Sequence, residues 1–435
     1  MISRASATHF HHSKSWLVIL AASLFFFYEF IQMQMFNSIS GSLMSHFDIN
    51  GEQLGNLSAM YLYGNVLFLF PAGLILDRVS TRQLILYTLV LCIAGTLGFA
   101  IAHHFWQAAL SRILAGVGNA FGFLSCMRLA ARWFPSRMLA FVVGVIVTIA
   151  MLGGVCAQTP LTLLTHYYSW QEIMFFNAAL GVIIFFVIFM QVQDYPETYE
   201  KQHQAQQQQL ESLGFFPSIG LAIRNPQNWL GGCYTSCLNL PIMLLGALWG
   251  NLYLEQVHHL TDIQASSVVS MIFIGMIIGS PLVGAWSDLI SLRKFPMILG
   301  AIFSLISILV LIEFQNLTYI PLLILFFSIG FFTSVQVLSY PLIAESNNRI
   351  VTSTATAWAS FIIMGGAALS QPLFGLIIDH FWNGLKINGV NIYSSTAFEH
   401  AMLLFPITFL FALICAFFVK ETQCREFNSH HQTRL

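Results

Sequence analysis

Long apolar runs dominate this sequence and limit its possible folds more than any other feature. Runs of roughly 20 residues recur along almost the whole chain, and as a helix each is long enough to cross about 30 Å of hydrocarbon. Only 8% of the residues are charged and 57% are hydrophobic, whereas about a quarter of the residues of a soluble domain are charged. We therefore expect an all-α integral membrane protein.

A polar stretch interrupts the apolar runs near the middle of the chain. About twelve spans can be counted, six on either side of this stretch, and the first runs from Trp16 to about Ser40. The short polar turns between spans make neighbouring helices antiparallel. The stretch contains a glutamine-rich run that buries too little apolar area to fold by itself. The predicted units are a tail (1–15), an N-terminal six-helix bundle (16–193), a linker (194–227), a C-terminal six-helix bundle (228–420) and a second tail (421–435).

The two predicted bundles repeat each other in sequence. Gly73 to Arg82 ends an apolar run with an aspartate and two arginines, and Gly284 to Arg293 repeats its Gly, Asp, Ser and second Arg at an offset of 288 − 77 = 211 residues. Pro160 and Pro372, each preceded by a Gly-Gly pair, agree at 372 − 160 = 212. Such a duplication predicts two pseudo-symmetric bundles with a solute path between them.

Positively charged residues predict the orientation in the membrane. With the amino terminus in the cytoplasm, the outer loops hold only Lys386, so both termini are expected inside. The inner segments then hold the other cations outside the spans: Arg4, Lys14, Arg78, Arg82, Arg132, Arg137, Lys201, Arg224, Arg293, Lys294, Arg349, Lys420, Arg425 and Arg434.

These motifs resemble those of a known family. The stretch Gly73 to Arg82 with its second copy looks like the loop signature of the major facilitator superfamily, and Arg112 to Gly118 is similar to that family's R-x-x-x-G-x-G signature. The resemblance covers Trp16 to Lys420. It implies an alternating-access transporter with twelve helices, and a small-molecule substrate bound between the bundles. The fifth span lacks the Gly-Pro pair common in antiporters of this family, which argues against a drug exporter.

Arg128 is the candidate anion ligand. It stands five residues before Trp133-Phe134-Pro135 and so resembles the arginine that binds a substrate carboxylate in bacterial organic-anion symporters. A guanidinium can hold a carboxylate with two parallel hydrogen bonds. The alternative is an anchor at the cytoplasmic end of the span, next to Arg132. Gln336 is the repeat mate of Arg128, at an offset of 208.

Glu29 is the candidate proton site. It lies about 13 residues, or roughly 20 Å, into the first span, where a carboxyl group without water favours its neutral form and could exchange a proton near neutral pH. Alternatively it pairs with an arginine or amide and joins helices. Tyr28 and Gln32 share one face of the same span and are expected beside the substrate.

Other intramembrane groups are expected to line or support the solute path. Tyr234, Asn239 and Trp249 on the seventh span are candidates for the pocket wall, with helix packing as the alternative. Close helix packing is expected of Arg112 and six glycines, which are Gly116, Gly118, Gly153, Gly154, Gly365 and Gly366.

The repeated loop signature predicts a gate at the cytoplasmic end. Asp77 and Asp288 are expected just past the cytoplasmic ends of their spans. There their carboxylates can accept hydrogen bonds from N–H groups at a helix start, or from arginines, and these contacts would break when the halves rock apart. The alternative is that the charges only set topology. The expected gating residues are Asp77, Arg78, Arg82, Asp288 and Arg293.

The sequence favours a monomeric secondary transporter of a small polar solute, preferably an organic anion, coupled to protons or another ion. No metal-ligand spacing, nucleophile motif or phosphate-binding loop predicts an enzyme, a metal site or a cofactor, and a net charge of −1 argues against nucleic acid as a partner. The expected location is the lipid bilayer of a bacterial inner membrane. An exporter of amphipathic compounds or siderophores, and a transport-dead solute sensor, remain as alternatives.

Overall fold

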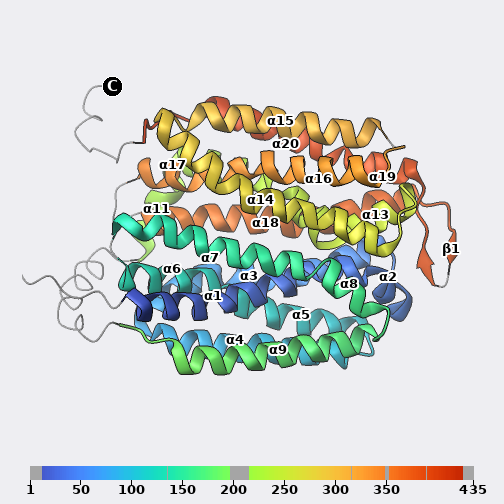
Figure 1. Cartoon of the computed structure of the whole chain (residues 1–435), viewed down its shortest axis with the longest axis horizontal. Coiled ribbons are helices and arrows are strands. Elements are labelled where there is room, and N and C mark those ends of the chain that lie inside the picture. Colours follow the sequence, from blue (N-terminus) through green and yellow to red (C-terminus); the bar gives the residue numbers. More distant parts are fainter. Residues whose placement is uncertain are drawn as a thin grey trace, which may run out of the picture.

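The computed structural model describes residues 12–134, 136–195, 215–314, 316–347, 352–387 and 389–424. Within them the chain is helical, apart from one two-stranded hairpin at the far end of the molecule (Figure 1). Helix α1 begins and helix α20 ends at the left of Figure 1, which we call the termini end; the hairpin lies at the opposite end.

The N-terminal half, described over residues 12–195, contains six passages between the two ends. Three of these passages are broken into two consecutive helices. The elements are α1 (His12–Gln34), α2 (Phe36–Phe47), α3 (Gly51–Arg78), α4 (Thr81–Ala100), α5 (Phe105–Asn119), α6 (Gly122–Trp133), α7 (Ser136–Cys156), α8 (Thr159–Thr165) and α9 (Trp170–Gln191).

The C-terminal half, described from residue 215, repeats this arrangement. Its helices are α11 (Phe215–Arg224), α12 (Pro226–Leu238), the π-helix η1 (Ile242–Trp249), α13 (Gly250–Val257), α14 (Asp262–Ile290), α15 (Lys294–Glu313), α16 (Tyr319–Thr333), the 3₁₀-helix η2 (Ser334–Leu338), α17 (Ser339–Glu345), α18 (Thr352–His380), α19 (Ser395–Met402) and α20 (Leu404–Phe418). The antiparallel strands β1 (Lys386–Ile387) and β2 (Val390–Asn391) join α18 to α19.

Local sequence signals explain where several passages begin at the opposite end. Asn50, Ser169 and Thr261 each bond the backbone three residues on, and a Gln or Glu at that position bonds back, so each forms a capping box before α3, α9 and α14. Among the described residues, eleven helical segments are long and apolar enough to cross a membrane. The expected all-α membrane fold is confirmed.

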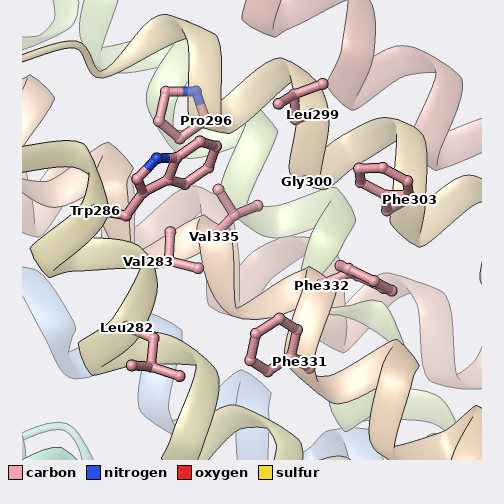
Figure 2. A pocket seen from close by; sticks show the side chains of 10 residues that line it. All are labelled: Leu282, Val283, Trp286, Pro296, Leu299, Gly300, Phe303, Phe331, Phe332 and Val335. Carbon is pink, nitrogen blue, oxygen red and sulfur yellow. The ribbon is translucent and has the colours of Figure 1, made fainter. Parts of the chain in front are cut away.

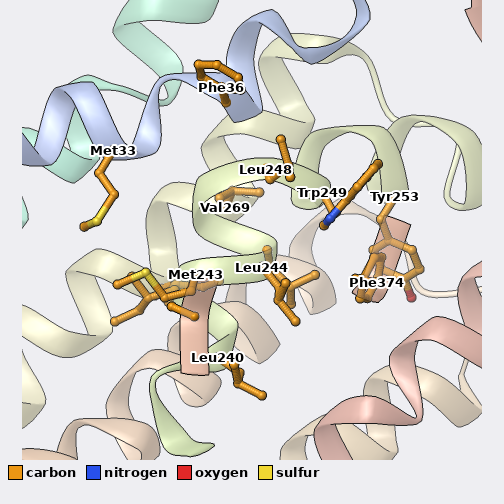
Figure 3. Close-up of a cluster of buried hydrophobic side chains, with 14 of the residues drawn as sticks. Met33, Phe36, Leu240, Met243, Leu244, Leu248, Trp249, Tyr253, Val269 and Phe374 are labelled. Carbon is orange, nitrogen blue, oxygen red and sulfur yellow. The ribbon is translucent and has the colours of Figure 1, made fainter. Parts of the chain in front are cut away.

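The two halves meet along pairs of helices from opposite bundles. Helix α3 packs along α18, and α7 with α8 packs against α14. A large buried apolar cluster continues across this seam and includes Met33, Phe36, Trp249 and Phe374 (Figure 3). Packing at the seam places α1 and η1 side by side near the middle of the molecule.

Several boundaries differ from those expected from the apolar pattern. The first passage continues beyond Ser40 to Phe47, because α2 follows a break at Met35 and buries Phe36, Ile39 and Leu43. Asp77 and Asp288 do not follow their helices but lie within the last turns of α3 and α14. Helix α11 lies inside the segment expected as a linker; residues 196–214 of that segment are outside the described part.

Candidate functional site

Glu29 is buried near the middle of the N-terminal half. Its side chain is 1% exposed, and neither carboxyl oxygen has a hydrogen-bond partner among the described residues. The carboxyl group packs against the backbone of Gly122 at the start of α6, where a Cβ atom would collide with both oxygens. The break between α5 and α6 and the missing side chain of Gly122 together create the space that Glu29 occupies.

Arg112 joins three helices next to Glu29. Its Nη1 donates to the backbone oxygen of Gln32 at 2.8 Å, and its guanidinium carbon lies 4.3 Å from the ring centre of Phe36 and 4.6 Å from that of Tyr61. The Tyr61 hydroxyl in turn donates to the backbone oxygen of Glu29 at 3.3 Å. Cation–π contacts are strong where water is excluded, so they hold α5 firmly against α2 and α3, while the bond to Gln32 joins α5 to α1.

Tyr28 and Gln32 lie on one helical face, but that face points into the N-terminal bundle. The Tyr28 hydroxyl is 3.3 Å from the Thr96 hydroxyl, and Gln32 Nε2 donates to the same oxygen at 2.6 Å. Tyr234 makes the equivalent kind of contact in the C-terminal half, where its hydroxyl donates to the backbone oxygen of Met297 at 2.7 Å. In this conformation these three side chains bond helices within a half rather than facing the other half.

Arg128 and Gln336 occupy related positions on α6 and η2. Arg128 is partly exposed, six residues beyond Gly122 towards the termini end. Gln336 is buried at 4% exposure, with its Nε2 3.7 Å from the Met276 sulfur. The duplication thus places one cation and one amide at equivalent levels of the two halves.

The second copy of the loop signature forms a cluster of charges. Arg293 donates from Nη1 to Asp288 at 2.7 Å and from Nη2 to Glu345 at 2.8 Å. The Glu421 carboxylate accepts from the backbone N–H groups of Arg293 and Lys294, both at 2.8 Å, and so caps the start of α15. All of these contacts join elements of the C-terminal half.

The first copy of the loop signature is also capped by a carboxylate, at the start of α4. The Asp194 carboxylate accepts from the backbone N–H of Arg82 at 2.9 Å and from the Ser80 hydroxyl, and its Oδ1 lies 3.6 Å from Nη1 of Arg132. Arg82 Nη2 donates to the backbone oxygen of Phe189 at 2.6 Å. The side chains of Asp77 and Arg78 are outside the described part of the structure, so their predicted gating role stays a prediction. Asp194 and Glu421, which cap equivalent helices, were missed because nothing near them in sequence marks them.

Most of the expected packing glycines are sites of close approach. A Cβ at Gly116 or Gly153 would collide with a backbone carbonyl of a neighbouring helix, and one at Gly154 would lie 2.6 Å from the Phe273 ring in the other half. Gly118 and Gly366 are equally crowded. The expectation is wrong for Gly365, because a Cβ there would meet nothing within 4 Å.

A carboxylate clasp joins the halves at the opposite end. Asp379, in the last turn of α18, accepts from the backbone N–H of Gly51 at 3.0 Å and of Glu52 at 2.6 Å, at the start of α3. The Tyr393 hydroxyl also donates to Asp379, at 2.7 Å. The start of a helix carries partial positive charge, so this carboxylate binds it favourably.

Amide and ionic contacts extend the clasp across the seam. Asn37 Oδ1 accepts from the backbone N–H of Asn251 at 2.9 Å across the seam, and its Nδ2 donates to Gln158 at 2.8 Å within the N-terminal half. Further out, His166 Nε2 lies 2.6 Å from an Asp262 carboxylate oxygen. These bonds join residues that lie far apart in the sequence, so no local pattern predicts the pairing.

A cavity of about 290 Å³ lies in the C-terminal half, away from these groups (Figure 2). Its walls come from α14, α15, α16 and η2 and are apolar, and the rings of Trp286, Phe303, Phe331 and Phe332 surround it. Because one half supplies all its walls, it is not a path between the halves.

Comparison with known proteins decides the family. Residues 21–261 and 235–433 each match the model of the Major Facilitator Superfamily. The chain belongs to the major facilitator superfamily. It is therefore a member of a family of membrane transporters and not of an enzyme family.

Distant relatives of this superfamily member include a sensor and a transporter. The chain is 23% identical to the membrane sensor protein UhpC of Escherichia coli over 404 residues, which cover 89% of this chain and 90% of the relative. It is 22% identical to the probable galactarate/D-glucarate transporter GudP of Escherichia coli, over 62% of this chain and 67% of the relative.

Solved structures share the fold at low sequence identity. A bacterial homologue of the human lysosomal transporter Spinster, in an inward-facing and unoccupied conformation, superposes with a TM-score of 0.70 at 14% identity, covering 98% of this chain and 100% of that one. A D-xylose–proton symporter gives a TM-score of 0.74 at 14% identity, covering 95% and 99%. This superfamily member thus has the expected transporter architecture.

Proposed function

We propose that this protein is a proton-coupled secondary transporter of small organic anions. The observation that carries this proposal is the environment of Glu29, whose carboxyl group is buried without a hydrogen bond from any described residue. An ionised carboxylate in such a place costs a large desolvation energy, so the group is stable there as the neutral acid. When a conformational change brings water or a cation to it, the group releases its proton.

Arg128 provides the anion ligand of the proposed transporter. It lies six residues from Gly122 on α6, so about 9 Å along the helix axis separates it from the level of Glu29. A solute carboxylate bound by its guanidinium would lie close enough to influence the protonation of Glu29. The name of the relative GudP, a galactarate/D-glucarate transporter, supports an anionic solute.

The excess of lysine and arginine at the termini end supports a cytoplasmic location for that end. The clasp at the opposite end then closes the outer side. A solute from outside enters only when the bonds of Asp379 and Asn37 across the seam are broken, so solute binding and clasp opening are linked.

Transport by purified protein in liposomes tests the proposal. We expect Arg128→Ala to abolish uptake of labelled organic anions such as D-glucarate and benzoate, while the amount of folded protein in the membrane stays unchanged. Lys386→Ala is the control: it removes an exposed cation whose solvent-exposed pair with Asp48 contributes little to the contact between the halves, so uptake should stay intact. Uptake by Arg128→Ala with wild-type apparent KM would remove Arg128 from the site.

A solute sensor is the second candidate. Two relatives are named membrane sensor protein UhpC, and they align with 89% and 84% of this chain. Counterflow separates the two functions, because a transporter exchanges labelled solute for unlabelled solute across the liposome membrane and a sensor that only binds does not. Binding without counterflow would favour the sensor.

A further inference from the structure

The seventh passage changes to a π-helix where it meets the other half. η1 is completely buried, and two of its backbone oxygens accept hydrogen bonds from side chains of other helices. Two glutamines bond these oxygens from outside: Gln371 Nε2 donates to Met243 at 3.0 Å, and Gln158 Nε2 donates to Gly246 at 2.7 Å. Figure 3 shows this segment between Met33 and Phe36 of the first passage and Phe374 of α18.

Three polar groups around η1 have no hydrogen-bond partner among the described residues. Neither amide atom of Gln34 is bonded, and the same is true of Gln371 Oε1 and Trp249 Nε1. Their side chains are 0%, 1% and 0% exposed. Gln34 Oε1 lies 3.5 Å from the point that a Cβ atom would occupy if Gly246 were an alanine, so it faces η1 directly.

Three other amides near η1 do have partners. Asn37, Gln158 and Asn251 lie at neighbouring levels and bond one another or the backbone. Buried polar groups are nearly always bonded, because losing their hydration without replacement is unfavourable. Gln34 has no such partner among the residues described here, so we expect it to gain one in another state.

We propose that Gln34, Gln371 and Trp249 form a second recognition site, which is closed here and binds the hydroxyl groups of the solute when the outer side opens. This inference rests on the proposed transport function. The indole N–H donates, Gln371 Oε1 accepts, and the Gln34 amide does both, so together they match a hydroxyl group, which also donates and accepts.

The spacing of this site agrees with an elongated solute. Gln34 stands five residues beyond Glu29 in the same passage, or about 7.5 Å along the helix axis. A hydroxylated acid several carbons long can therefore extend from the level of Glu29 to η1. We infer that the solute is a hydroxylated organic acid rather than a purely apolar one.

Two six-carbon diacids test the inference, because D-glucarate and adipate differ only in four hydroxyl groups. Gln34→Leu should raise the KM for D-glucarate at least tenfold relative to that for adipate. Trp249→Phe keeps an aromatic ring against Phe374 and removes the N–H donor. It should also raise the ratio of the KM for D-glucarate to the KM for adipate.

Thermal stability separates a recognition role from a structural one. Gln34→Leu should melt at or above the wild-type temperature, because it replaces an unbonded buried amide with an apolar group of similar size. Gln158→Leu is the matched control and should melt lower, because it leaves Gly246 and Asn37 without their partner.

An unchanged KM ratio in both variants would overturn the inference, and so would a Gln34→Leu variant that melts as low as Gln158→Leu. If the wild type takes up adipate but not D-glucarate, this inference fails while the proposed transport of anions stands. If it takes up neither diacid, this inference fails, because a hydroxylated six-carbon diacid is then not a solute of this protein. The proposed function then depends on the uptake of other organic anions such as benzoate.

Discussion

Breaking the clasp at Asp379 should shift the protein towards states in which the opposite end is open. Asp379 holds two backbone N–H groups of α3 with separate carboxylate oxygens. In Asp379→Asn one oxygen becomes an NH₂ group, which cannot accept from a backbone N–H. The bond between the halves is weakened, while the bond from Tyr393 to Asp379 lies within the C-terminal half.

The size of the shift follows from the bonds that are lost. A hydrogen bond to a charged group contributes about 1.5–3 kcal/mol, and the carboxylate at the helix start adds roughly 0.3–1 kcal/mol. When the end opens, Asp379 becomes hydrated, so we take about 2 kcal/mol as the net loss, which changes the population ratio about 30-fold.

Distances between spin labels on the two halves measure this ratio. Labels at the exposed positions Tyr167 and Leu385 should report a longer distance in Asp379→Asn than in the otherwise unchanged protein. Asp48→Asn is the control: its pair with Lys386, 2.9 Å apart, also joins the two halves but is exposed to solvent and so contributes little. An unchanged distribution in Asp379→Asn would refute the clasp.

Two further predictions concern Gly122 and Glu421. Gly122→Ala should displace the Glu29 carboxyl group, lower the stability by about 1–3 kcal/mol and impair uptake. Gly144→Ala is the control and should have none of these effects, because a Cβ there would meet no atom within 4 Å. Melting and uptake assays compare the two variants. Glu421 is partly buried, which favours its neutral form, but backbone N–H groups including that of Arg293 outweigh this, so its pKa lies below the ordinary value. Its contribution to stability is therefore complete above the ordinary glutamate pKa of about 4.3 and lost as the pH falls through the lowered pKa. The wild type should melt above Glu421→Gln at pH 7, with a difference that shrinks at acid pH; equal melting temperatures at pH 7 would contradict the capping role.

The fold could be predicted from the sequence because it follows from local signals. Apolar runs of sufficient length form membrane spans, and the repeat of Gly73 to Arg82 at Gly284 to Arg293 indicated two related halves. Boundaries were less certain, since apolar content does not determine where a helix ends. Asp77 and Asp288 were expected beyond their helices, but polar residues continue a helix when its backbone bonds are satisfied.

The candidate site was only partly predictable, for a physical reason. Helical spacing correctly placed Tyr28 and Gln32 on one face, but only the packing of α4 shows that this face bonds Thr96 inside the bundle. The bonds between Gly51 and Asp379 join residues 328 positions apart. No local pattern distinguishes such a carboxylate from any other at a helix end.

Proton-coupled uptake tests the central claim most directly. Purified protein in liposomes is given a labelled organic anion, with and without an imposed pH gradient, and the wild type is compared with Glu29→Gln. The account predicts that the gradient drives accumulation in the wild type, and that Glu29→Gln exchanges the anion across the membrane but does not accumulate it. Equal gradient-driven accumulation by both proteins would contradict the account.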